Sequence, residues 1–255
     1  MRISVIIPTW NRADCIERAI NSCQKADEII VVDDGSTDNT YDKLIYKKGI
    51  KHIILKENKG VNNARNKGIL QATGDYIIFL DSDDELTVDA IETIRNAHLE
   101  KINFFRTKNV KSNIQQTGTY TYKDWLEGKT TGEFLGVYKK EIFNDNLFDP
   151  ELFCFEIVWV TNTIKKEGWY KAFNKIIRIY HDEQKNRMSK ELSFFKHITD
   201  KYEGYCQYYD IVIDGLTEFQ LKKKEGLLIF KILLYKYLRW ISWETYYLQE
   251  RTTDH

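Results

Sequence analysis

Residues 77–84 read Ile77-Ile78-Phe79-Leu80-Asp81-Ser82-Asp83-Asp84, a short apolar run that is followed at once by three carboxylates within four positions. A continuous apolar run of this length predicts a strand that is covered on both faces of a sheet. Ligands of open α/β sheets bind where strands end, and a cation that carries substrate phosphates needs one or two carboxylates there. The stretch therefore predicts a strand that ends in a ligand site. For this short motif alone, a solvated acidic turn that caps the next helix is the alternative.

Apolar strands and helical patterns alternate at short intervals through roughly the first hundred residues. This alternation predicts a doubly wound, mostly parallel sheet. Right-handed crossovers would bring the loops at Pro8, Asp34 and Asp81 to one edge of that sheet. We expect strands at 3–7, 29–32, 52–55 and 77–80, and helices over 13–23, 41–45, 58–70 and 86–99.

The second half of the chain has a weaker pattern. Its apolar runs predict further strands and helices, separated by a polar segment that suggests a loop or a hairpin. We expect strands at 102–106, 134–138 and 172–180, a loop or hairpin over 109–129, a short helix at 139–143, a helix over 153–166, and helices from about 188 onward.

Composition limits the class of protein. Lys+Arg and Asp+Glu both number 38, so the net charge of zero argues against binding to nucleic acid through bulk charge. The four cysteines, Cys15, Cys23, Cys154 and Cys206, form no C-x-x-C pair, which favours buried, reduced thiols in a cytoplasmic protein. No apolar segment reaches the ~20 residues of a membrane-spanning helix, and the N-terminal apolar run is too short for a signal peptide.

The predicted loops carry the groups that a nucleotide needs. A carboxylate such as Asp34 can accept a hydrogen bond from a ring N–H of a base, and the amide of Asn58 and the guanidinium of Arg65 can bind its carbonyl oxygens. Another carboxylate can bind ribose hydroxyls. Asp83 can hold a divalent cation on a diphosphate.

Four motifs in order resemble those of the family 2 glycosyltransferases, and together they cover residues 1 to about 99. The resemblance implies the GT-A fold and transfer of a sugar from a nucleotide donor, usually a UDP-sugar, to an acceptor hydroxyl with inversion at the anomeric carbon. The motifs are Val5-Ile6-Ile7-Pro8-Thr9-Trp10-Asn11, Val31-Val32-Asp33-Asp34-Gly35-Ser36-Thr37-Asp38, Asn58-Lys59-Gly60 with Ala64-Arg65-Asn66, and Phe79-Leu80-Asp81-Ser82-Asp83-Asp84.

The same resemblance implies roles for individual residues. It assigns Asp81 to the ribose and Asp83 to a Mn²⁺ or Mg²⁺ ion, whereas Asp84 either assists the cation or caps the next helix. It also implies three regions: a nucleotide-sugar-binding half over 1–100, an acceptor-binding and catalytic half over 101–190, and a helical C-terminal extension over 191–255. The residues expected around the rest of the donor are Pro8, Thr9, Asn11, Asp34, Asn58, Arg65 and Ser82.

The general base should come from the second half, because it must lie across the sugar from the diphosphate. Glu156 is our candidate, since it lies about where the family has an acidic pair at a helix start. The chain has Glu156-Ile157 where the family often has Glu-Asp, and Asp149 and Glu151 are weaker alternatives. Further on, His181 is a candidate third metal ligand, although a lone histidine is more often structural.

Two other functions compete with sugar transfer at this point. The first is a non-catalytic protein of the same fold that binds a sugar nucleotide or acts as a scaffold. The second is a nucleotidyltransferase, which would need a glycine-rich loop after the first strand to bind a triphosphate, and Pro8-Thr9-Trp10-Asn11 does not provide one.

The C-terminal stretch suggests where the acceptor is met. Residues 227–248 are rich in Leu, Ile, Tyr and Trp and follow Lys222-Lys223-Lys224. This pattern suggests an amphipathic helix on the anionic inner membrane face, where a lipid-linked acceptor would be met; a saccharide acceptor is the alternative. Packing on the catalytic domain and a homodimer contact are the alternatives.

Overall fold

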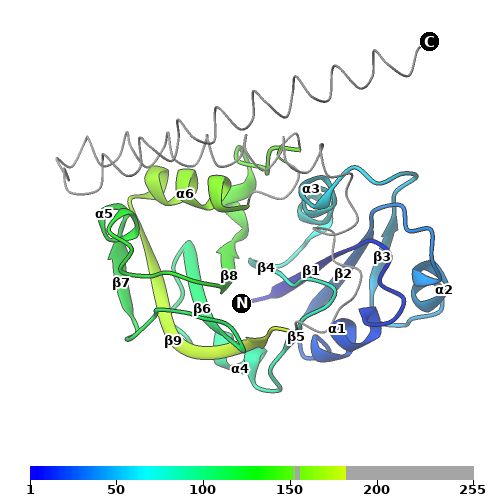
Figure 1. The fold of residues 1–255 in the computed structure, drawn as a ribbon, viewed down its shortest axis with the longest axis horizontal. Coiled ribbons are helices and arrows are strands. Elements are labelled where there is room, and N and C mark those ends of the chain that lie inside the picture. The colour runs from blue at the N-terminus through cyan, green and yellow to red at the C-terminus, as the bar shows by residue number, and fades with distance from the viewer. Residues whose placement is uncertain (151, 153–155, 182–255) are drawn as a thin grey trace, which may run out of the picture. The chain divides into compact units, whose positions relative to one another are not determined.

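The computed structural model describes residues 1–150, 152 and 156–181 (Figure 1). Its centre is a mixed sheet in the order β3-β2-β1-β4-β8-β6-β9-β5, with β7 paired to β9. The first four strands in that order are parallel, which confirms the doubly wound arrangement predicted for the N-terminal half. These strands are β1 (Ile3–Thr9), β2 (Glu28–Asp33), β3 (Lys51–Ile54) and β4 (Tyr76–Phe79).

The second half extends the same sheet with mixed strand directions. Strand β8 (Phe134–Lys139) is antiparallel to both β4 and β6 (Ile102–Lys108), and β9 (Trp169–Ile179) is parallel to β6. Two short strands, β5 (Glu85–Leu86) and β7 (Gly118–Thr121), pair antiparallel to β9. The sheet therefore continues from the strands of the nucleotide motifs into the second half without a break.

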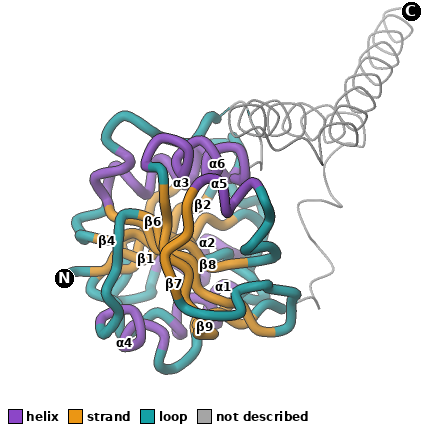
Figure 2. Tube along the Cα trace, turned by 90° about the vertical axis from the view of Figure 1, so that its left-hand side faces the viewer, coloured by secondary structure: helices purple, strands orange, loops and turns teal. Residues whose placement is uncertain are grey.

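Helices cover both faces of the sheet, as Figures 1 and 2 show. On one face, α1 (Ile16–Ser22), α2 (Thr40–Ile45) and α4 (Ala90–Arg95) contribute to a buried apolar cluster with alternate residues of β1. On the other face lies α3 (Val61–Gln71), whose Gly68 approaches Ile6 of β1 closely. This arrangement follows from topology: the chain moves outward from β1 to β3 through α1 and α2, then returns through α3 to place β4 on the other side of β1.

The second-half elements agree with the sequence in kind but differ at several ends. The helix expected over 86–99 is wrong at its start, because Glu85–Leu86 pairs with β9 and the Thr87 amide donates to the Ile177 carbonyl (2.9 Å) before the helix begins. The segment 109–129 contains, besides β7, the helix α5 (Tyr122–Leu126), whose Thr121 and Asp124 form a capping box. The short helix is a 3₁₀ turn at Lys140–Phe143, and α6 is Glu156–Glu167.

The sequence predicts buried, reduced cysteines and no membrane-spanning helix. Cys15 and Cys23 are free and buried, as predicted, whereas Cys154 and Cys206 lie outside the described residues. Among the described residues no helix has the length and apolar character needed to cross a membrane. The helices expected from about 188, including 227–248, also lie outside the described residues, so the membrane and dimer contacts remain predictions.

The chain divides into two compact units. The first comprises Met1–Pro150 with Thr163–Gln184 and contains every strand of the sheet; the second comprises Glu151–Asn162 with Lys185–His255. The sheet therefore does not end near residue 100. The strands of both halves, 1–100 and 101–190, lie in the first unit.

We expect Gly35→Ala to lower the free energy of unfolding more than Gly49→Ala does. Both glycines have positive φ, at 72° and 80°, so both substitutions carry the cost of a left-handed alanine, about 1–2 kcal/mol. Only at Gly35 would the new Cβ meet main chain, 2.6 Å from the Glu57 carbonyl carbon, which adds about 1–3 kcal/mol. Urea unfolding of both variants measures the difference, and equal losses would contradict the close contact.

Candidate functional site

The candidate site lies where the direction of the sheet connections changes. Strands β1 and β4 are neighbours, yet the chain leaves β1 toward β2 and reaches β4 from β3, so their carboxyl ends lie at the topological switch point. Thr9 ends β1 in register with Asp33 of β2, and its buried hydroxyl has no hydrogen-bond partner among the described residues. A buried polar atom of this kind is costly unless a ligand or water binds it.

Asn11 connects the loops that follow β1 and β2. Its main chain is left-handed (φ 52°), and its side-chain oxygen accepts hydrogen bonds from the amides of Thr37 (2.8 Å) and Asp38 (3.3 Å). The Asn11 amide in turn donates to the Ser36 hydroxyl (2.9 Å). Hydrogen bonds therefore join the Pro8-to-Asn11 motif to the motif after β2. Both loops lie at one edge of the sheet, as the sequence predicted.

Asp34 is buried and fixes the third loop. One carboxylate oxygen accepts the Lys59 amide (3.0 Å) and the other accepts the Gly60 amide (2.8 Å). Burial raises the pKa of this carboxyl above its usual range, while the two amides oppose the rise. The amide of Gly60 (φ 92°) also donates to the side-chain oxygen of the exposed Asn58 (3.1 Å). Asp34 and Asn58 are thus brought together, as predicted.

Arg65 projects from α3 between two aromatic rings. Its guanidinium lies 5.7 Å from the ring centre of Phe79 and 5.5 Å from that of Phe148, and a terminal nitrogen is 3.5 Å from Asp81 Oδ1. The neighbouring Asn66 accepts the Phe148 amide (3.0 Å) and donates to the Phe148 carbonyl (2.8 Å). The aromatic contacts and the Asn66 bonds therefore fix the orientation of the buried arginine.

The acidic stretch after β4 forms a tight turn in which the Asp84 amide donates to the Asp81 carbonyl (3.0 Å). Ser82 is buried, and the carboxylates of Asp81 and Asp83 are partly exposed. Asp84 is buried and lies 3.5 Å from the Arg178 guanidinium of β9. Burial first, and then the negative charges of Asp81 and Asp83, raise its pKa to about 7.

This turn fits a divalent cation bound together with a diphosphate. Asp81 and Asp83 are both partly exposed in one turn, and Mg²⁺-type sites often use one or two carboxylates while substrate phosphates supply further ligands. Within the part of the chain that the structure describes, no cluster of three or more His, Cys, Asp or Glu side chains could hold a metal without such help. His181, the predicted third ligand, places Nε2 3.2 Å from Glu85 Oε1, and its amide donates to Asp84 Oδ1 (3.3 Å).

Glu156, the predicted base, is half-buried in the first turn of α6 and belongs to the second compact unit. Its role remains a prediction. Asp149 lies in the first unit, where its carbonyl accepts a hydrogen bond from the Asn62 side chain (3.0 Å), and Glu151 lies outside the described residues.

Sequence reasoning missed the residues that support the site from a distance. Arg178 lies in the apolar run Ile176-Ile177-Arg178-Ile179, and a charged residue inside a buried strand was the available signal. Asn66 belongs to the Ala64-Arg65-Asn66 motif, but the sequence assigned it no role. Phe148 and Arg18 gave no signal, because only the fold brings them to the site.

Solved structures share this fold. Residues 1–349 of TarS from S. aureus superpose with a TM-score of 0.65 at 19% identity, covering 99% of this chain and 92% of that one. A structure of the same TarS fragment in complex with UDP-GlcNAc gives a TM-score of 0.63 at 21% identity, covering 88% and 76% of the two chains. At these identities the likeness establishes the fold alone, and it confirms the predicted GT-A fold.

Sequence comparison establishes the family. The Glycosyl transferase family 2 model matches residues 4–160, and the chain belongs to this family. The GalNAc(5)-diNAcBac-PP-undecaprenol beta-1,3-glucosyltransferase of Campylobacter jejuni is 32% identical over 238 residues, covering 84% of this chain and 75% of that protein. The glycosyltransferase YibD of Escherichia coli K12 is 33% identical over 190 residues, covering 63% and 55%. The chain is therefore a glycosyltransferase rather than a scaffold protein or a nucleotidyltransferase.

We expect Asn66→Ala to destabilise the protein by about 1–3 kcal/mol, because both hydrogen bonds to the main chain of buried Phe148 are lost. Asn63→Ala is the matched control. It lies on the same helix and gains the same helix propensity, but its side chain makes no hydrogen bond to the described residues. Thermal unfolding of the two variants measures the difference. Equal stability would show that the Asn66 contacts contribute nothing.

Proposed function

We propose that this glycosyltransferase moves a sugar from a UDP-sugar to an acceptor hydroxyl of a lipid-linked or polysaccharide glycan, with inversion at the anomeric carbon. One observation carries the proposal: at the switch point, the neighbouring strands β1, β2 and β4 lead into the Thr9 hydroxyl, the buried Asp34 carboxylate and Asp81, which pairs with Arg65. Strand ends at a switch point are where open α/β sheets bind nucleotides.

The nucleotide part of the donor would lie against the loops that follow β1, β2, β3 and β4. Thr9, Asp34, Asn58 and Arg65 surround the base in this proposal, Asp81 binds the ribose, and Pro8, Asn11 and Ser82 shape the same loops. Structures of TarS in complex with UDP and with UDP-GlcNAc support a UDP-sugar. GDP-Man and Mn²⁺ in the mannosyltransferase PcManGT, which has a TM-score of 0.55 and 17% identity, make a guanine donor the alternative to test.

A Mn²⁺ or Mg²⁺ ion would be held by Asp83 together with the donor diphosphate. When bound, the cation neutralises the charge that develops on the departing diphosphate. His181 would join it through Nε2 only after exchanging the Glu85 carboxylate for the ion, since the two lie 3.2 Å apart. The turn of residues 81–84 itself supplies the oxygen ligands that such an ion prefers.

The acceptor would be activated by Glu156. A carboxylate that removes the proton of the attacking hydroxyl allows a single displacement at the anomeric carbon, which inverts its configuration. The name of the C. jejuni relative specifies an undecaprenol-linked saccharide, which supports a lipid-linked acceptor here. An acceptor of that kind agrees with peripheral contact of the predicted helix over 227–248 with the inner membrane face, and with a cytoplasmic catalytic domain.

Calorimetric titration with UDP-, GDP- and dTDP-sugars, each with and without Mn²⁺, tests the donor. We expect UDP-sugars to bind most tightly and only with the cation. Asp83→Asn should abolish the effect of Mn²⁺ on binding and lower kcat/KM by at least about 100-fold, because the cation contributes several kcal/mol. The matched control is Asp42→Asn on the exposed first turn of α2, which should bind like the wild type. Tighter binding of GDP-sugars, or an unchanged Asp83→Asn variant, would refute the assignment.

Glu156→Gln should retain donor binding and lower transfer by about 10²–10⁴-fold, the usual contribution of a general base. Glu92→Gln is the matched control, because Glu92 also lies in the first turn of a helix, α4, so that both variants lose the same favourable charge at a helix N-terminus. Turnover with a lipid-linked oligosaccharide and ITC with the donor provide the two readouts. Transfer at the wild-type rate would mean that another residue is the base.

A further inference from the structure

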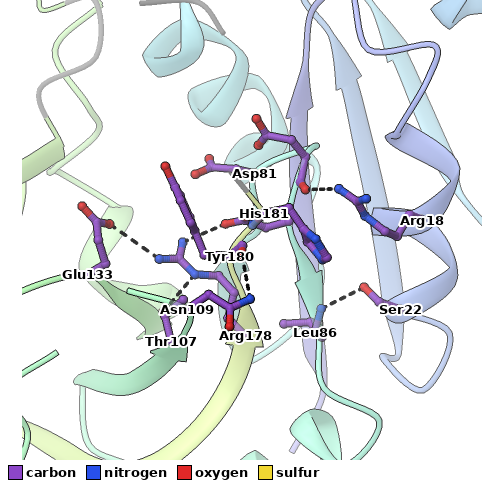
Figure 3. Close-up of polar contacts among 12 residues, drawn as sticks. Arg18, Ser22, Asp81, Leu86, Thr107, Asn109, Glu133, Arg178, Tyr180 and His181 are labelled. Atoms are coloured by element: carbon purple, nitrogen blue, oxygen red, sulfur yellow. Dashed lines mark hydrogen bonds and ion pairs between the residues drawn. The ribbon is translucent and has the colours of Figure 1, made fainter. Parts of the chain in front are cut away.

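We propose that Asp84 and Arg178 are positioning residues, whose buried pair presets the turn of residues 81–84 so that Asp83 can bind the cation. The inference rests on the proposed function and assigns a role to two buried residues outside the donor and acceptor contacts proposed above. Figure 3 shows the arginine of β9 beside Thr107, Glu133 and the segment that ends in His181.

The first argument is the way in which Arg178 is fixed. Its Nε donates to the buried Thr107 hydroxyl (3.0 Å), one terminal nitrogen lies 3.6 Å from Glu133, and the other lies 3.5 Å from Asp84. The side chains of Arg178 and Asp84 are only 7% and 1% exposed. The Nε hydrogen bond orients the buried guanidinium, and the ion pair with Asp84 attaches the turn to it.

The second argument is that both Asp84 oxygens are directed to the end of β9. One oxygen faces Arg178 and the other accepts the His181 amide (3.3 Å). Strand pairing adds to this attachment, since Glu85 and Leu86 are in register with Ile179 and Arg178. The chain that follows Asp83 is therefore anchored by side-chain and main-chain contacts together.

The third argument concerns the other side of the turn. Arg18 of α1 donates a hydrogen bond from a terminal nitrogen to the Asp83 carbonyl. The main chain at Asp83 is thus held by α1, and the next residue is held by β9, while the Asp83 side chain stays partly exposed. A ligand whose main chain is fixed and whose side chain is partly exposed is suited to bind a cation with little reordering.

Stability alone does not account for the pair. A buried ion pair often contributes no more to folding than apolar side chains of similar size, although removal of one partner is strongly destabilising. Replacement of both partners therefore separates the two roles. The double replacement should avoid the instability caused by removing one partner alone. It would still leave the turn without its ion pair to β9.

The test measures Mn²⁺ binding by EPR of the free ion, in the presence of saturating UDP, for the double variant Asp84→Leu/Arg178→Met and for the conservative variant Asp84→Asn. We expect both to weaken Mn²⁺ binding by about 10–100-fold, the usual effect of residues that orient a metal ligand. Donor KM should rise more than kcat falls. Arg95→Met is the matched control, since it removes an arginine that pairs with Asp27 (2.9 Å) just before β2, at the opposite edge of the sheet.

The outcomes are distinct. Weaker Mn²⁺ binding in variants with wild-type circular dichroism, together with an unchanged Arg95→Met control, supports the inference. Wild-type Mn²⁺ binding in either folded variant overturns it and leaves the proposed function intact. If the wild-type protein transfers sugar but binds no Mn²⁺ with UDP, the metal role of Asp83 and this inference are both wrong. If the double variant does not fold, Asp84→Asn decides.

Discussion

A buried charge must find its partner inside the protein, and this constraint shapes the whole carboxyl edge of the sheet. Asp34 meets it with two main-chain amides, Arg65 with two aromatic rings and Asp81, and Asp84 with Arg178. Each solution joins segments that are distant in sequence. The loops are therefore fixed relative to one another before any ligand arrives, which reduces the entropy that binding would cost.

The constraint also explains why the chain continues the sheet beyond β4. The parallel strands β1 to β4 supply the acidic turn, but the basic side chain that pairs with Asp84 comes from β9. Strand β9 runs parallel to β6 and carries Arg178 toward the same edge. In this way the second half contributes to the donor side of the site as well as to the acceptor side that the motifs suggested.

The strand ends and the edge of the sheet that they share could be predicted from the sequence, because they depend on patterns of neighbouring residues. Strand ends such as Thr9 and Asp81 follow continuous apolar runs, and the βα alternation with right-handed crossovers determines which edge they share. Residues whose role depends on distant partners could not be predicted. Leu86 looked helical because its apolar neighbours suit a helix, yet pairing with β9, some 90 residues later, overrides that preference. Phe148 reached Arg65 only through contacts that no spacing reveals.

The pairing of β5 with β9 has a consequence for how the protein is made. On the ribosome, residues 1–100 emerge with every nucleotide motif but without the strand that neutralises Asp84. Contacts of such high sequence separation form late and slow folding. A nascent chain thus carries its acidic turn without the anchor from β9 until residue 178 has been synthesised, so the turn is completed near the end of translation of the sheet rather than with the motifs themselves.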